Sequence, residues 1–148
     1  MELHVLSDSI QFIRKNASMF FPNGEPKAVL CAQHLVAEVL ALGGTDVAVL
    51  RDASWWAVGS NVEWFLADRT TREQFACLIP LPEVGPNASR VEVVIAAFAQ
   101  DLATLGGPEL EVLHGATPPE EFINRLRARA LVRAVVFRIP DDAQGAET

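Results

Sequence analysis

The sequence predicts one α+β domain, a two-layer sandwich in which helices cover one face of a mixed, mainly antiparallel sheet. Segments with helical spacing and segments with alternating apolar residues follow one another in an irregular order, which excludes a regular βαβ repeat. The chain has 148 residues, enough for one domain with a real core but too few for two ordinary ones. We therefore expect a single domain over 1–139 and a disordered acidic tail over 140–148.

The first half of the chain predicts two helices followed by a hairpin. LSDSIQFIRKN, residues 6–16, has the spacing of a short amphipathic helix, and the prolines and glycine of MFFPNGEP end it. A second helix runs from about residue 27 to 42 and stops at the glycine pair 43–44. TDVAVLRDASWWAVGS then alternates like two strands around a tight turn at 52–53.

The second half predicts two more helices and two more strands. Three prolines mark the stretch 67–88 as a long connection with at most one short element. Ser89 and Glu92 have the spacing of a capping box, so a helix should begin there and continue to the glycines at 106–107. ELEVLH reads as a strand, TPPEEFINRLRARA as a helix and LVRAVVFRI as the last strand.

Composition and charge exclude several function classes. Twelve basic against nineteen acidic side chains give a formal net charge of −7, which repels nucleic acids and anionic lipids. The chain opens without a leader pattern and has no run of about 20 apolar residues, so we expect a cytoplasmic protein that does not span a membrane. GxGxxG and GxxxxGK[ST] motifs are absent. We expect no bound cofactor.

One polar stripe stands out on the otherwise apolar helix 27–42. His34 and Glu38 lie one turn apart there, and Cys31 falls on the same face. The two polar side chains are interpreted either as a hydrogen-bonded pair or as two ligands of a metal site completed by Cys31 and by His4 or His114. Because paired-cysteine and HExxH motifs are absent, we expect no metal.

Two segments, IQFIRKNASMFF and QHLVAEVL, carry a third interpretation of the stripe. They resemble VRKRPGMYIG and HHLVYEVVDN in the ATPase domain of type II topoisomerase B subunits, the gyrase B group of the Bergerat-fold or GHKL superfamily. VVIAAFAQDLATLGGPELEVLHG and AVVFRIPDD are similar to later segments of that domain, so the resemblance covers most of residues 9–142. It implies helices on a mixed sheet, with a nucleotide pocket between them.

The resemblance also implies what this chain has lost. Glu38 stands where the family has its general base, and His34 where an imidazole supports that base. The family's magnesium-binding Asn is Leu42 here, which offers no oxygen to the ion. The adenine-binding Asp falls at or near Gly59, and the stretch 67–88 is too short and too poor in glycine to form the family's ATP lid.

A remnant dyad without its substrate-holding parts predicts a non-catalytic binding or regulatory module on a degenerate GHKL ATPase-like fold. The alternative is an active enzyme that binds and hydrolyses ATP with displaced magnesium and adenine ligands. That enzyme would have to use Asn61, Asp52 or Asp68 in place of the missing groups.

Two further features predict a protein partner. Trp55 and Trp56 are adjacent on a predicted strand, so their rings should point to opposite faces of the sheet, one into the core and one outward. Exposed tryptophans are enriched at interfaces. Arg125 and Arg129 belong to the main basic concentration of the chain, which is either a solvated helix face or a surface for an acidic partner.

Overall fold

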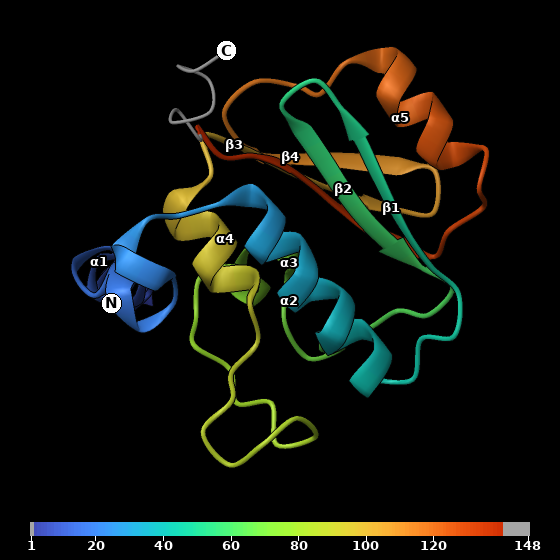
Figure 1. The fold of residues 1–148 in the computed structure, drawn as a ribbon. Helices are drawn as coiled ribbons and strands as arrows, with labels where there is room; N and C mark the ends of the chain where they lie inside the picture. Colours follow the sequence, from blue (N-terminus) through green and yellow to red (C-terminus); the bar gives the residue numbers. More distant parts are fainter. Residues whose placement is uncertain (1, 141–148) are drawn as a thin grey trace.

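Five α-helices, two short 3₁₀ turns and five strands make up the described part of the chain (Figure 1). The structure is a computed structural model that describes residues 2–140, and the side chains of residues 9–140. The helices and turns are α1 (Glu2–Lys15), η1 (Ala17–Met19), η2 (Pro22–Gly24), α2 (Ala28–Ala41), α3 (Thr71–Gln74), α4 (Glu92–Phe98) and α5 (Glu120–Arg127). The strands are β1 (Val47–Asp52), β2 (Trp55–Ser60), β3 (Asp101–Gly106), β4 (Glu109–His114) and β5 (Arg133–Arg138).

The strands form one sheet in the order β1-β2-β5-β3-β4, and each pair of neighbours is antiparallel. This confirms the α+β class with an antiparallel sheet. The predicted mixed sheet is wrong for the described residues. The α5 crossover does connect two strands that run in the same direction, β4 and β5, but β3 lies between them. As a result, no two neighbouring strands within residues 2–140 run parallel.

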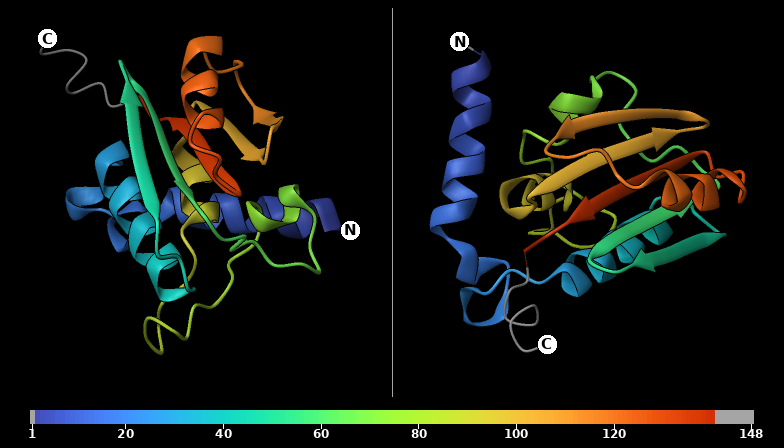
Figure 2. Two further views of the ribbon diagram at one scale, coloured as in Figure 1. Left: turned by 90° about the vertical axis from the view of Figure 1, so that its right-hand side faces the viewer. Right: turned by 90° about the horizontal axis from the view of Figure 1, so that it is seen from above.

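Helices cover both faces of the sheet, not one as predicted (Figure 2). Val135 and Phe137 of β5 belong to the core cluster that also holds side chains of α2 and α4. Their neighbours Ala134 and Val136 belong to a second cluster, with apolar side chains of α5. A strand that is buried on both faces reads as a continuous apolar run, and AVVF at 134–137 has that character.

The helix predicted to run to the glycines at 106–107 ends at Phe98, and the remainder is strand β3. The apolar positions in this stretch fit a helix, but strand pairing with β5 and β4 prevails. Arg138 of β5 holds the start of strand β3 in place: its Nε donates to Asp101 Oδ2 at 2.7 Å, and its carbonyl accepts from Gln100 N. The predicted capping box is also wrong: Val91 precedes the helix, and Glu92 is buried.

The other boundaries lie close to those predicted. Helix α2 covers 28–41 and stops, as predicted, at the glycine pair 43–44: Gly43 follows the cap residue Leu42 with a φ of +103°, which suits glycine. The hairpin is confirmed with its turn at 53–54, and α1 begins at Glu2, earlier than expected. Among the described residues, no helix has the length and apolar character needed to cross a membrane. The disordered tail predicted over 140–148 lies, from residue 141 onward, outside the described residues.

Candidate functional site

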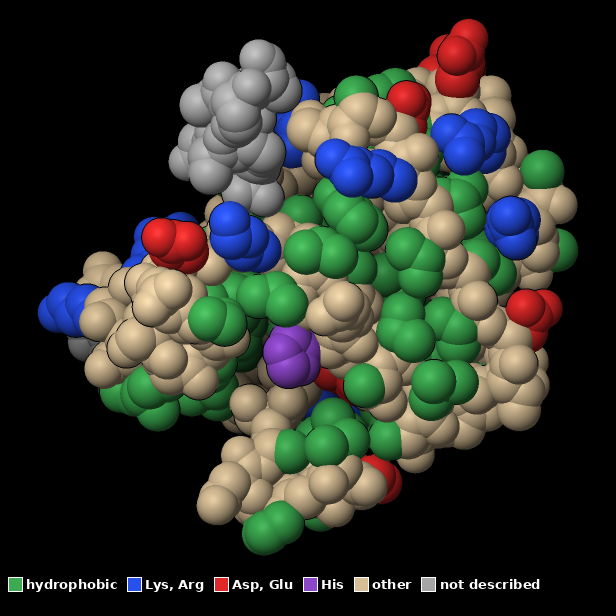
Figure 3. Space-filling view, in the orientation of Figure 1, with side chains coloured by type: hydrophobic (Ala, Val, Ile, Leu, Met, Phe, Trp, Pro, Cys, Tyr) green, Lys and Arg blue, Asp and Glu red, His purple; other side chains and the backbone are tan. Residues whose placement is uncertain are grey.

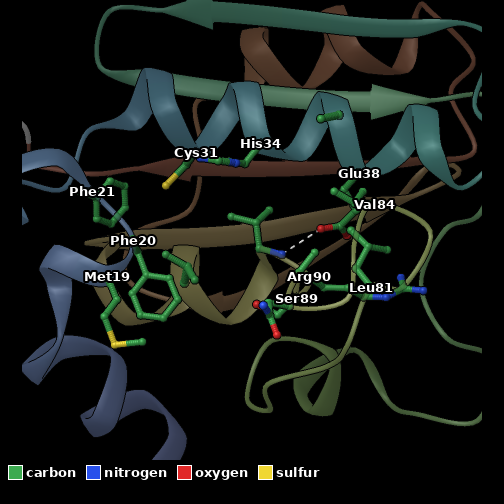
Figure 4. A pocket seen from close by; sticks show the side chains of 15 residues that line it. Met19, Phe20, Phe21, Cys31, His34, Glu38, Leu81, Val84, Ser89 and Arg90 are labelled. Carbon is green, nitrogen blue, oxygen red and sulfur yellow. Dashed lines mark hydrogen bonds between the residues drawn. The ribbon is translucent and has the colours of Figure 1, made fainter.

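A cavity of about 410 Å³ lies between α2, the turns η1 and η2, and the segment 81–91 that leads into α4. Figure 3 shows the molecule hollowed on this side, and Figure 4 shows the side chains around the hollow. His34 and Glu38 both belong to its wall. The cavity therefore lies beside the polar stripe that the sequence singles out on this helix.

The wall of the cavity is mainly apolar. Its large apolar side chains are Met19, Phe20, Phe21, Leu81, Val84 and Val94. Its polar and charged side chains are His34, Glu38, Asn87, Ser89 and Arg90. Figure 4 shows the aromatic side chains on the side of η1 and η2, with Leu81 and Val84 on the opposite side.

Two irregular segments enclose the cavity, and prolines account for their irregularity. Pro22 and Pro26 keep the chain between α1 and α2 out of regular helix. Residues 79–90 form a long hairpin-like loop, in which Arg90 N donates to Ile79 O at 2.8 Å and Leu81 N to Ala88 O at 2.9 Å. These backbone bonds hold the tip of the loop opposite α2.

Two buried carboxyl groups meet beside the cavity, that of the wall residue Glu38 and that of Glu92, which lies behind the wall. Glu38 of α2 is 2 % exposed, and its Oε1 accepts from Val91 N at 2.8 Å, the bond drawn in Figure 4. Glu92 of α4 is fully buried, and its Oε2 accepts from Trp64 Nε1 at 2.8 Å. As two carboxylates, neither group can donate to the other, which leaves Glu38 Oε2 and Glu92 Oε1 without a partner.

A shared proton resolves this conflict. Burial raises the pKa of Glu38 from an ordinary 4.5 to about 10, and a hydrogen bond to Glu92 and the charge of Glu92 act in the same direction. The Val91 N–H and the positive charge of Arg90 oppose the rise in pKa. Glu38 is thus protonated at neutral pH and donates to Glu92.

The remaining members of the polar stripe do not join this pair. His34 is exposed at the wall of the cavity, and among the described residues no hydrogen bond links it to Glu38. The predicted hydrogen-bonded His34–Glu38 pair is therefore wrong, because the carboxyl group turns to α4. Cys31 is fully buried, and burial raises the pKa of its thiol to about 12.

The structure separates the suggested metal ligands. His114 lines a different cavity, together with Arg72 and Phe75, and its Nε2 lies 3.0 Å from Ala99 O. The side chain of His4 lies outside the described residues. Within residues 9–140 no group of three His, Cys, Asp or Glu side chains is arranged to hold a metal ion.

The residues that the GHKL resemblance assigns to nucleotide and magnesium binding do not lie together around the cavity. A side chain at Gly59 would meet Leu131 and Ala134 on the α5 side of the sheet, whereas the cavity lies on the α2 side. Leu42 is the residue that caps the end of α2. The suggested replacement ligands Asn61, Asp52 and Asp68 are all exposed and none belongs to the wall of the cavity.

The two tryptophans lie on opposite faces as predicted, but neither ring is freely exposed. Trp55 is 6 % exposed in the α5-side core under Arg138, and Trp56 is half-buried, with Arg51 4.9 Å from its ring centre. An outward tryptophan is therefore not found, because α5 covers the second face. Arg125 and Arg129 are exposed around α5, and the partner surface stays a prediction that rests on them.

Sequence reasoning missed most of the site. The capping-box spacing predicts that Glu92 caps a helix, although its position inside the apolar run VEVVIAAF is a signal of a buried carboxyl group. Trp64 donates to Glu92, and Arg90 Nη1 donates to Trp64 O at 2.7 Å, but neither residue belongs to a motif that can be recognised in the sequence. Leu81 and Val84 share the cavity wall with residues of α2 because of the course of the loop 79–90, and no local sequence pattern predicts that course.

Comparisons of the chain with models of protein families, with curated proteins and with solved structures found no match. The GHKL resemblance stays a prediction from the sequence. The cavity and its paired carboxyl groups are thus the features from which a function has to be argued.

Proposed function

We propose that this protein is a non-catalytic binding module that holds a small, mainly apolar molecule in the cavity beside Glu38. The observation that carries the proposal is the cavity itself, about 410 Å³ in volume, with apolar walls and a few polar groups. Binding sites for small molecules are typically concavities of about 300–1,000 Å³ with this mixture of groups. Side chains from four separate segments enclose it without filling it.

The charges at the cavity favour such a molecule over a nucleotide. A triphosphate needs cations or clustered backbone N–H groups around it. Here the wall carries Glu38, which is paired with Glu92 behind it, and the wall residue Arg90 is 7 % exposed with its Nη1 bonded to Trp64 O. On the GHKL interpretation, the module is a degenerate ATPase-like domain, and His34 and Glu38, at the positions of the former dyad, both belong to the wall of the cavity.

The proposal is tested by titrating the protein with phenylbutanol, a neutral probe with an aromatic tail, and in parallel with ATP and magnesium. We expect saturable calorimetric binding of phenylbutanol and a rise in melting temperature. For ATP we expect no saturable binding tighter than about 100 µM. ATP binding above that strength would instead support the active GHKL enzyme.

A variant with a filled cavity tests whether the probe binds at this site. Ala37 is exposed on α2 and belongs to the wall, so Ala37→Trp should fill the space and weaken phenylbutanol binding at least about tenfold. Gln33→Trp is the matched control, since Gln33 is exposed on the same helix outside the wall, and its affinity should stay as in the wild type. Equal affinities of the two variants would contradict the proposal.

A further inference from the structure

A second cavity, of about 370 Å³, lies apart from the one beside Glu38, and the two share no wall residue. Its wall is formed by α1, the segment 72–76 around α3, one residue of α4 and the adjoining parts of β3 and β4. Figure 2 shows α1 beside α4 at one end of the sheet. The polar and charged side chains of this wall are Gln11, Arg14, Arg72 and His114.

Backbone carbonyl groups hold the two arginine side chains at this wall. Arg14 Nε donates to Ala97 O at 2.7 Å, and Arg72 Nη1 donates to Leu113 O at 3.0 Å. A guanidinium group has five N–H donors, and each of these bonds uses one of them. The two groups are therefore fixed in position while most of their donors remain for a ligand.

The bonds also bring the polar side chains of the wall together. His114 directly follows Leu113, the acceptor of Arg72. Its Nε2 lies 3.0 Å from Ala99 O, two positions after the carbonyl that accepts from Arg14. Both arginines and the imidazole thus meet where the end of α4 passes the end of β4.

The positive charge of the two arginines is not matched by acidic groups in the wall. Among the side chains of residues 9–140, no Asp or Glu belongs to this wall, and no ion pair involves Arg14 or Arg72. Glu73, the neighbour of Arg72, accepts from Thr70 N at 2.8 Å. Both arginines are exposed, so an anion from solvent can reach them.

We infer that this second cavity binds a small organic carboxylate with an apolar body, held by the guanidinium groups of Arg14 and Arg72. The planar edge of a guanidinium group matches a carboxylate, and hydrogen bonds between two charged groups are strong. The buried side chains of Phe75, Leu102 and Leu113 give the wall an apolar surface for the body of the ligand. The inference concerns a separate site and does not depend on the proposed function.

NMR with phenylbutyrate and its neutral analogue phenylbutanol tests both the site and the carboxylate. Nuclear Overhauser effects should join the ring protons of phenylbutyrate to the methyl groups of Leu102 and Leu113. Phenylbutanol lacks the charge and should show none to these two residues. Calorimetric titration of the wild type with phenylbutyrate should give saturable binding, and Ala37→Trp, which fills the other cavity, should leave that affinity within about threefold.

Three variants separate the two arginines from general attraction of an anion. Arg14→Gln and Arg72→Gln should each weaken phenylbutyrate binding at least about tenfold, because each removes a charged donor. Arg129→Gln removes the same charge from an exposed position outside the wall, and the affinity should stay within about threefold of the wild type.

A fourth variant leaves both arginines and their backbone bonds in place. Gln11 is exposed on α1 and belongs to the wall, so Gln11→Trp should fill the cavity and weaken phenylbutyrate binding at least about tenfold.

Three results would overturn the inference. They are the absence of saturable phenylbutyrate binding, equal affinities of the Arg72→Gln and Arg129→Gln proteins, and Overhauser effects to Leu81 and Val84 in place of Leu102 and Leu113. The binding of phenylbutanol beside Glu38 is measured separately, so either site can fail without the other.

Discussion

Glu38 explains why an apolar helix keeps a carboxyl group. Its Oε1 accepts the backbone N–H of Val91 at 2.8 Å, so the side chain of α2 holds the turn that leads into α4. Its second oxygen meets Glu92, and burial keeps the proton on Glu38. A protonated carboxyl group both accepts from the backbone and donates to its neighbour, which neither a carboxylate nor an apolar side chain can do.

This arrangement predicts a stability that falls with rising pH. The folded pKa of Glu38, about 10, lies above its ordinary 4.5, so the unfolded chain releases a proton that the folded chain keeps. The contribution is fully present below about pH 4.5 and declines at higher pH by up to about 1.4 kcal/mol per pH unit. Glu38→Gln should remove that decline and be progressively more stable than the wild type between pH 5.5 and 8.5.

Urea unfolding of both proteins at three pH values measures the effect. Glutamine keeps an acceptor for Val91 N and gains a donor for Glu92, so it preserves both bonds without a proton. Glu83→Gln, at an exposed position, should leave the wild-type slope unchanged. If the free energy of unfolding of the Glu38→Gln protein falls with pH as steeply as that of the wild type, Glu38 is ionised in the folded state.

At the same scale, the sequence predicted the position of Glu38 but not its partner. A carboxyl group on an apolar helix stands out in the sequence, because a buried carboxyl group needs a hydrogen-bond partner. Its nearest sequence neighbour of the right chemistry was His34, and the structure instead pairs it with Glu92, 54 positions along the chain. Pairing across that separation follows from the packing of α2 on α4. The spacing of apolar residues within one helix does not predict which other helix it packs on.

At the scale of elements, the end of α2 depends on a close approach to the sheet. A Cβ on Gly44 would lie 2.6 Å from Val39 Cγ1 and 2.9 Å from Ser60 Oγ, so glycine lets the helix end against β2. Gly44→Ala should destabilise the protein by about 1–3 kcal/mol, the usual cost of overpacking.

Gly85→Ala is the matched control for this change. A Cβ on Gly85 meets nothing within 4 Å. The free energy of unfolding of the Gly85→Ala protein should therefore stay within about 0.5 kcal/mol of the wild type. Thermal unfolding of the two variants compares them directly. Equal melting temperatures would mean that the end of α2 moves freely away from Ser60.

Elements were predictable where local pattern and tertiary pairing agree. The helix over 28–41, the hairpin 47–60 and the strands 109–114 and 133–138 were all visible in the sequence. The stretch 99–106 was not, because its short apolar run fits a helix as well as a strand. Its place between β5 and β4 decides the outcome, and that is a contact between distant segments.

For the whole molecule, the sheet separates two apolar layers and the cavity belongs to one of them. Helices α2 and α4 pack on one face, and α5 on the other (Figure 2). The cavity lies on the α2 side, where the irregular segments around 19–21 and 81–91 close over the gap beside α2 and α4. Prolines let the sequence predict that these segments are irregular, but not the paths they take.

The most direct test of the account is the location of a bound probe by NMR. With phenylbutanol at saturation, nuclear Overhauser effects should join its ring protons to the methyl groups of Leu81, Val84 and Val94 around the cavity. Leu110 and Val112, which pack on the α5 side of the sheet, should show none. Effects confined to Leu110 and Val112, or no effects at all, would contradict the claim that this cavity is the binding site.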